Sequence, residues 1–150
     1  MDFKRSDPSN EIRPAIPADA RALVPLFEQL GYPTERTEIR SRLESKSGEW
    51  EVLVAQHEGG ISGFVAVEIQ HDFIVAKRGL ILGLVVADGW RGGGIGAALL
   101  AAAEAWAFER GAPLLVVRSN VIRERAHRFY EREGYRRVKT QHVFEKRGGF

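Results

Sequence analysis

The chain has 150 residues, of which 44% are hydrophobic and 28% charged, which is typical of one soluble globular domain large enough to bury a core. With 22 basic and 20 acidic residues, the net charge of +2 is too small to indicate binding to nucleic acid or to a membrane surface. The sequence contains no cysteine, which excludes disulfides, thiolate catalysis and cysteine-ligated zinc.

The first half of the chain predicts a strand, two helices and an antiparallel hairpin. The strand is expected at residues 12–15, and the first helix starts near Pro17 and ends at Gly31, with apolar residues at helical spacing between them. A second helix is expected at about residues 34–45. The apolar runs WEVLVAQHE and ISGFVAVEI then flank Gly59-Gly60, a pair typical of a two-residue hairpin turn.

The second half predicts a strand–helix–strand crossover followed by one more helix and strand. RGLILGLVV is continuously apolar, as in a strand buried on both faces, and it is followed by a helix ended by Gly111 and the strand PLLVVRS. A helix ended by Gly134 and a last strand in YRRVKTQHVFEK complete the order β-α-α-β-β-β-α-β-α-β. This order predicts a single α/β domain over residues 1–150, with residues 1–10 loosely ordered. Its mixed sheet is antiparallel in the N-terminal half and has a parallel crossover in the second half.

The stretch RGGGIG, Arg91 to Gly96, lies between the apolar strand and the helix of the crossover. A helix N-terminus offers backbone N–H groups and the positive end of the helix dipole to an anion, and glycines allow close approach of a ligand. The stretch therefore indicates a phosphate-binding loop, with a solvent-exposed turn as the alternative. A Walker loop is excluded because no Gly-Lys-Ser/Thr follows, and a dinucleotide fingerprint fits poorly because five residues separate the strand from the glycines.

Two segments resemble the hallmarks of one enzyme family. LGLVVADGWRGGGIGAALL resembles motif A of the GNAT superfamily of N-acetyltransferases, Arg/Gln-x-x-Gly-x-Gly/Ala, which Arg91, Gly94 and Gly96 match. AHRFYEREGY, Ala126 to Tyr135, resembles the second hallmark, A-x-x-F-Y-E-x-x-G-F/Y. The resemblance extends more weakly over nearly the whole chain and implies the GNAT-like fold.

The resemblance implies acetyl-CoA as co-substrate and assigns it a set of contacts. The pantetheine arm is expected to pair with the backbone before the loop, and main-chain N–H groups are expected to hold the pyrophosphate beside the charge of Arg91. Arg123 replaces an Asn of many relatives, so it is expected either to contact CoA or to join a solvated basic cluster, and Asn120 either to contact CoA or to cap the helix. The other expected CoA contacts are Leu84, Val85, Val86, Gly92, Gly93, Gly94, Ile95, Gly96 and Ala97.

For the chemistry, the resemblance assigns Tyr130 as the general acid that protonates the departing thiolate. With a pKa of about 10 the phenol is neutral at pH 7, so it has a proton to give to the departing thiolate, whose conjugate thiol has a pKa of about 8.5. Many relatives carry a glutamate on one of the two central strands, and both strands lack it here. Glu68 on the neighbouring strand and an ordered water are left as alternatives for the base, with a surface-facing structural carboxylate as the other interpretation of Glu68. A substrate of lower pKa would need neither.

The acceptor is expected to be a small-molecule amine or a protein amine, with Leu30–Thr34, His71 and Asp72 as candidate specificity elements. A non-catalytic acyl-CoA sensor of the same fold and, more remotely, a dinucleotide-dependent oxidoreductase are the alternative functions. The four histidines lack a metal-binding spacing, so no metal is expected. We expect a cytoplasmic protein without nucleic-acid or membrane partners, and a homodimer is a family-level expectation only.

Overall fold

The computed structural model describes residues 10–119 and 121–149, and the chain divides into two compact units, Met1–Arg118 and Ser119–Phe150. The predicted single domain stays a prediction, and the expected loose order of residues 1–9 lies outside the described residues. None of the helices in the described part of the chain is long and apolar enough to span a membrane.

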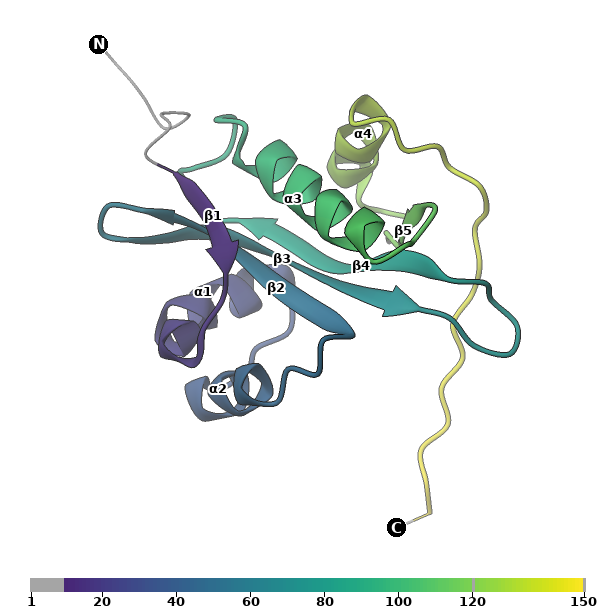
Figure 1. The fold of residues 1–150 in the computed structure, drawn as a ribbon, viewed down its shortest axis with the longest axis horizontal. Helices are drawn as coiled ribbons and strands as arrows, with labels where there is room; N and C mark the ends of the chain where they lie inside the picture. Colours follow the sequence, from purple (N-terminus) through teal and green to yellow (C-terminus); the bar gives the residue numbers. More distant parts are fainter. Residues whose placement is uncertain (1–9, 120, 150) are drawn as a thin grey trace. The chain divides into compact units, whose positions relative to one another are not determined.

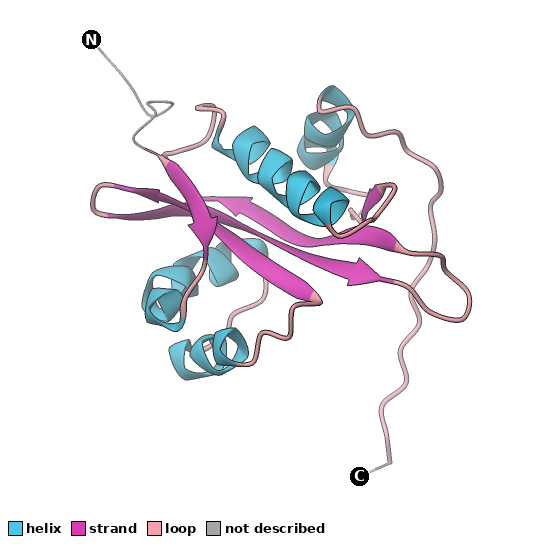
Figure 2. Cartoon of the chain, in the orientation of Figure 1, coloured by secondary structure: helices cyan, strands magenta, loops and turns pink. Residues whose placement is uncertain are grey.

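The first unit is built on a five-stranded mixed sheet in the order β1-β2-β3-β4-β5 (Figures 1 and 2). Neighbouring strands from β1 to β4 are antiparallel and β4 and β5 run parallel, which confirms the mixed sheet that the sequence predicts. The strands are β1 (Glu11–Pro14), β2 (Trp50–His57), β3 (Gly60–Gln70), β4 (Arg78–Val86) and β5 (Leu115–Val117). The hairpin turn consists of Glu58 and Gly59, one residue earlier than expected, because His57 pairs with Gly60.

Helices cover both faces of this sheet (Figure 1). A 3₁₀ turn, η1 (Pro17–Asp19), leads into α1 (Ala20–Leu30), which packs with α2 (Arg36–Glu44) on one face, and α3 (Ile95–Glu109) packs on the other. The proline at position 25 lies inside α1, yet the helix continues through it to Leu30.

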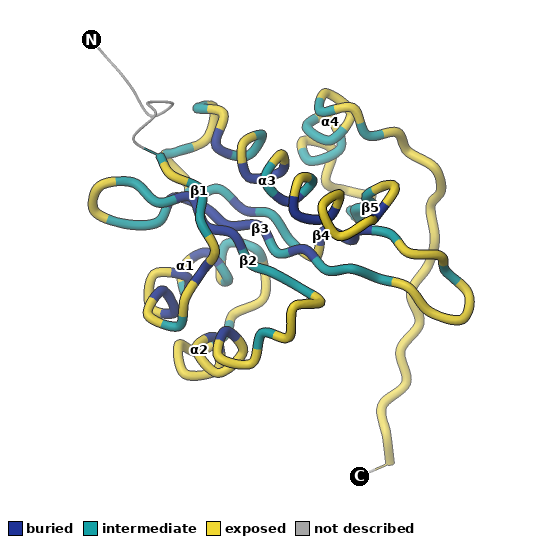
Figure 3. Tube along the Cα trace, viewed as in Figure 1, coloured by how far each residue is buried: buried dark blue, intermediate teal, exposed yellow. Residues whose placement is uncertain are grey.

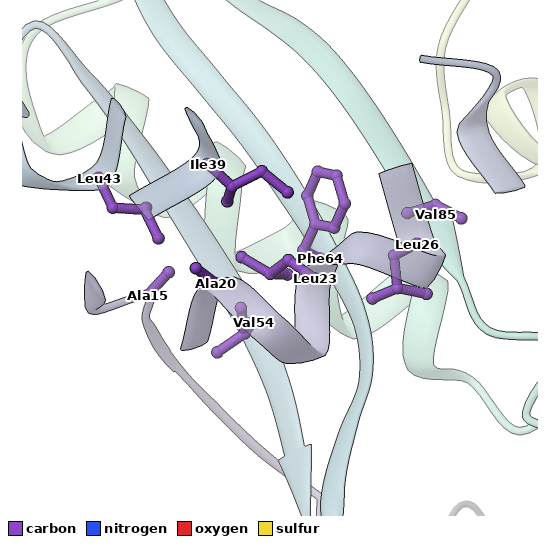
Figure 4. Packing of buried hydrophobic residues seen from close by; sticks show 9 residues of the cluster. All are labelled: Ala15, Ala20, Leu23, Leu26, Ile39, Leu43, Val54, Phe64 and Val85. Carbon is purple, nitrogen blue, oxygen red and sulfur yellow. The ribbon is translucent and has the colours of Figure 1, made fainter. Parts of the chain in front are cut away.

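The core between α1, α2 and the sheet is a cluster of nine buried apolar residues (Figure 4). They are Ala15, Ala20, Leu23, Leu26, Ile39, Leu43, Val54, Phe64 and Val85. On the opposite face α3 lies so close to β4 that a Cβ atom added at Gly79 would come within 2.9 Å of the Cβ of Ala107. Figure 3 shows the result as a buried centre of the sheet between the exposed outer surfaces of the helices.

The second unit holds α4 (Glu124–Arg132), and residues 135–149 that follow adopt no regular secondary structure (Figure 2). The predicted last strand in YRRVKTQHVFEK is therefore wrong. Its apolar side chains would not share one face of a strand. Side chains alternate between the two faces, so Val138 and Phe144 would lie on one face and Val143 on the other. All three are more than 70% exposed, so the segment has little apolar surface to bury in return for strand pairing.

Two further strand predictions need correction. PLLVVRS forms only the three-residue β5, and β4 is not buried on both faces along its whole length, since the side chain of Leu82 is 52% exposed. Within the described residues, β5 pairs with Gly79–Ile81, and the rest of β4 has no strand on that side.

Candidate active site

The C-terminal half of β4 is open along one edge. In the described part of the chain, β5 pairs with β4 only from Gly79 to Ile81, so Leu82–Val86 has β3 as its single strand neighbour. The pairing of β4 with β3 also shifts by one residue, because Val67 lies opposite Ile81 and Ala66 opposite Gly83. The extra residue, Leu82, forms a bulge, which bends a strand and increases its twist.

Strand alternation determines which backbone groups face the open edge. Ala87 donates its N–H to the carbonyl of Ser62 at 2.7 Å and therefore faces β3. Because successive residues of a strand direct their N–H and C=O groups to opposite sides, Val86 and Leu84 face the open edge. The N–H and C=O groups of Val85 point toward β3. The residue itself is buried in the core, at 7% exposure. Of the three strand residues expected to contact CoA through the backbone, only Leu84 and Val86 direct their polar groups to this edge.

Gln29, in the last turn of α1, closes the end of the open edge. Its Nε2 donates to the carbonyl of Val86 at 2.7 Å, and its Oε1 accepts the N–H of Asp88 at 3.2 Å. Sequence reasoning missed this residue. The only local signal is that a polar side chain borders the apolar face of α1, between Leu26 and Leu30, and surface positions show the same pattern.

The glycine loop connects β4 to α3. Gly92 and Gly94 both have φ of +84°, which residues with a side chain rarely adopt, and the space where their Cβ atoms would lie is empty to 4 Å. Gly93 does not have a positive φ. Gly94 is the N-cap of α3 and provides no capping side chain.

The first turn of α3 carries the N–H groups that the sequence assigns to an anion. Its first backbone hydrogen bond runs from the N–H of Ala98 to the carbonyl of Gly94 at 3.0 Å. The N–H groups of Ile95, Gly96 and Ala97 therefore have no acceptor within the helix. Together with the helix dipole, they form a position suited to a phosphate group.

Two side-chain contacts border the loop. Arg91 forms an exposed ion pair with Asp88 at 3.4 Å, of the kind that contributes little to stability and leaves the guanidinium accessible to an anion. The rings of Trp90 and His57 lie 4.2 Å apart between centroids and tilted by 31°. The Nδ1 of His57 contacts the carbonyl of Glu58 at 2.7 Å, which fixes the ring at the end of β2.

The second unit contains Tyr130, the residue expected to act as general acid. It lies on α4, is half-buried, and contacts the rings of Phe129 and Tyr135 edge-on at 5.1 and 5.8 Å. Burial raises the pKa of Tyr130 above its usual value, and the positive charge of Arg123, the N-cap residue of α4, opposes this shift. The phenol is therefore protonated at neutral pH. Asn120 lies outside the described residues.

Glu68, one of the two alternatives for the base, is half-buried on β3 opposite Trp50 and Leu80. Leu80 lies two residues before the bulge at Leu82, which places Glu68 about 7 Å along the strands from the start of the open edge. The described residues contain no group of three or more histidines and acids that could hold a metal ion.

The expected specificity elements form two exposed turns. In the loop between β3 and β4, the carboxylate of Asp72 accepts the N–H groups of Val75 and Ile74 at 2.7 and 2.8 Å, which lowers the pKa of Asp72. After α1, the hydroxyl of Thr34 donates to the carbonyl of Tyr32 at 2.7 Å.

Comparison with known proteins identifies the family. The sequence profile of the acetyltransferase (GNAT) family matches residues 18–135. The chain is 31% identical to an aminoglycoside N(6′)-acetyltransferase of Stenotrophomonas maltophilia, over 83% of this chain and 84% of the relative. It is 33% identical to an aminoalkylphosphonate N-acetyltransferase of Salmonella typhimurium, over 86% of each.

Solved structures share the fold. The aminoglycoside N-acetyltransferase AAC(6′)-Iy, in complex with the bisubstrate analogue CoA-S-monomethyl-acetylneamine, aligns with a TM-score of 0.83 at 17% identity, covering 93% of this chain and 99% of that one. Glucosamine-6-phosphate N-acetyltransferase from Arabidopsis thaliana aligns with a TM-score of 0.78 at 23% identity, covering 91% and 97%. The profile match over most of the chain is decisive, and the protein belongs to the acetyltransferase (GNAT) family.

Proposed function

We propose that the protein transfers the acetyl group of acetyl-CoA to the nitrogen of an amine, which attacks the thioester directly while both substrates are bound. The observation that carries this proposal is the continuity of three features in the first unit. The open edge of β4 leads into the glycine loop, and the loop leads into the uncapped N-terminus of α3. An extended amide-containing arm followed by a pyrophosphate fits this sequence of features.

The residues of this region fit the donor on chemical grounds. Leu84 and Val86 present backbone groups that can pair with amides of an extended chain, in the manner of an added strand. The N–H groups from Gly92 to Ala97 and the guanidinium of Arg91 can hold phosphate oxygens. Acetyl-CoA, when bound, supplies the activated thioester. The chain's contribution on this side is to bind and orient it.

Tyr130 is proposed to donate a proton to the departing CoA sulfur. Burial raises the pKa of Tyr130, so the phenol carries its proton at neutral pH and has one to donate. Arg123, at the start of the same helix, is proposed either to contact a CoA phosphate or to remain solvated. The protein thus needs a protonated Tyr130 and a deprotonated amine at the same time.

The acceptor amine must lose a proton before it attacks, and an alkylammonium with a pKa of about 10.4 does so at pH 7 at a cost of about 4.6 kcal/mol. Glu68 and an ordered water both remain proposals for the base. If Glu68→Gln has a kcat equal to that of the wild type at every pH, an ordered water and not Glu68 removes the proton from the amine.

The named relatives support a small aliphatic amine as acceptor, since one is named for aminoglycosides and the other for aminoalkylphosphonates. We therefore propose this substrate class ahead of a protein amine. We also place the reaction in the cytoplasm.

Incubation of the protein with acetyl-CoA and a panel of amines, followed by measurement of free thiol, tests the proposal. The panel contains an aminoglycoside, an aminoalkylphosphonate, a lysine-containing peptide and a buffer blank. Thiol release that depends on one amine class confirms the transfer and identifies the class. CoA binding without turnover on any amine would instead favour the sensor function.

A further inference from the structure

One side chain of α1 holds the junction between β4 and the glycine loop. The amide of Gln29 donates to the carbonyl of Val86 at 2.7 Å and accepts the N–H of Asp88 at 3.2 Å. A single half-buried glutamine thus satisfies two backbone groups on opposite sides of one residue, Ala87. Both groups lie where the open edge of β4 ends and the loop begins.

The position of Gln29 is fixed by the last turn of α1. Gly31 ends this helix with φ of +101°, and the N–H of Tyr32 bonds to the carbonyl of Phe27 at 2.9 Å. The ring of Phe27 stacks on Phe64 of β3 at 5.5 Å between centroids. A Cβ atom at Gly83 would lie 3.1 Å from the side chain of Leu30, so this turn also contacts the open half of β4.

We propose that Gln29 is a positioning residue for the CoA donor, which ends the open edge of β4 at Val86 and sets the point where the bound chain leaves the strand for the glycine loop. The proposal rests on the proposed function of this edge. Because Nε2 occupies the carbonyl of Val86, the edge offers the N–H and C=O of Leu84 and only the N–H of Val86.

The physical consequence concerns register. If the carbonyl of Val86 were available, an extended amide chain could pair there as well as at Leu84, two residues earlier. Two strand residues correspond to about 6.6 Å, enough to move a thioester out of reach of an amine. Gln29 removes the competing acceptor and, by bonding Asp88 with the same side chain, holds the open edge and the glycine loop at the spacing that one bound chain must contact together. Because CoA makes both sets of contacts only at this spacing, loss of Gln29 is expected to weaken binding of the donor and to leave the acceptor unaffected.

Two substitutions test the two hydrogen bonds of Gln29 separately, the one that its Nε2 donates and the one that its Oε1 accepts. Gln29→Glu retains an oxygen for the N–H of Asp88 and places a carboxylate against the carbonyl of Val86. Gln29→Lys retains a donor for that carbonyl. Ala22 is exposed and lies two helical turns earlier on the same stripe of α1, so Ala22→Glu and Ala22→Lys are matched controls for the added charges.

The expected result is a KM for acetyl-CoA raised about tenfold in Gln29→Glu, with the KM of the amine unchanged. Gln29→Lys and both Ala22 variants are expected to stay within about twofold of the wild type. Melting temperatures are measured alongside. An unchanged KM for acetyl-CoA in Gln29→Glu would overturn the proposal, whether or not the melting temperature falls. An equal rise in the KM for acetyl-CoA in Gln29→Glu and Gln29→Lys would also overturn it.

Calorimetric titration with CoA keeps this test separate from that of the proposed function. If the wild type binds CoA and acetylates no amine, the transfer proposal fails, and the dissociation constants of the four variants still decide the role of Gln29. If the wild type binds no CoA, both proposals fail. If the wild type and Gln29→Glu bind CoA with the same affinity, the proposal for Gln29 fails and the proposed function is unaffected.

Discussion

At the scale of single residues, Tyr130 is the most direct test of the chemistry. Tyr130→Phe removes the hydroxyl and retains the ring contacts with Phe129 and Tyr135. We expect kcat to fall about a hundredfold, the usual contribution of a general acid, and the dissociation constant of CoA to stay unchanged. Steady-state kinetics with calorimetric titration of CoA measures both quantities.

The pH profile adds a check with a definite sign. A general acid works only while protonated, and the pKa of Tyr130 is raised, so titration of this phenol removes activity only as the pH rises beyond the usual tyrosine value of about 10. Tyr135→Phe, which alters the neighbouring ring, is the control and should retain kcat. A Tyr130→Phe variant as fast as the wild type would exclude the role.

Asp19 tests the stability of the first unit. It is 8% exposed, and its carboxylate accepts two hydrogen bonds from the guanidinium of Arg13, each of 2.9 Å, and one from the N–H of Ile16 at 2.8 Å. The hydrogen bonds from Arg13 are the largest cause of the lowered pKa of Asp19. As the pH falls, the unfolded chain takes up this proton before the folded chain does. The stabilisation is therefore complete above about pH 4 and is lost as the pH falls through the lowered pKa.

We expect Asp19→Asn to lower the free energy of unfolding at pH 7 by about 2 kcal/mol. The difference in this free energy between the variant and the wild type should become smaller below about pH 4. Urea unfolding at several pH values measures both. Glu38→Gln is the control, because it breaks an exposed ion pair with Arg42 and should cost less than about 0.5 kcal/mol. A pH-independent difference between Asp19→Asn and the wild type would show that the carboxylate's charge is not responsible.

At the scale of elements, the sequence predicts features that depend on neighbouring residues, such as the ends of helices. Gly31, Gly111 and Gly134 each end a helix with φ between +88° and +101°, as glycine-terminated periodic segments indicate. Pairing between strands is not local. The sequence of RGLILGLVV cannot show that β5 stops after Val117, so the open edge of β4 was expected from the family resemblance alone.

Gly94 tests the start of α3. Gly94→Ala forces a side chain into φ of +84°, at a cost of about 1–2 kcal/mol, and puts a methyl group into the open space beside the helix N-terminus. We expect a drop in melting temperature and a dissociation constant for CoA raised about tenfold. Gly48 also has a positive φ and open space, and lies in the connection between α2 and β2. Gly48→Ala should lower the melting temperature similarly and leave CoA affinity unchanged. Equal CoA affinities for the two variants would argue against a phosphate site at Gly94.

At the scale of the whole molecule, the residues proposed for the reaction are divided along the chain between the two compact units. Those proposed to bind the donor lie in Met1–Arg118, and Tyr130, the proposed proton donor, lies in Ser119–Phe150. Sequence motifs predict the glycine loop and Tyr130 as site residues, because each motif is a short contiguous pattern. Gln29 could not be predicted in this way, since its proposed role depends on a contact with Val86, 57 positions away.

The central claim is that CoA binds along the open edge of β4 and the loop before α3. The most direct measurement is an amide NMR titration of the full-length protein with CoA, read residue by residue. The predicted result is that the amides of Leu84, Val86 and Gly92–Ala97 shift and exchange more slowly with solvent, while that of Val85, which faces β3, changes least along the strand. Binding of CoA that leaves the amides of Leu84, Val86 and Gly94–Ala97 unchanged, and shifts another set instead, would contradict it.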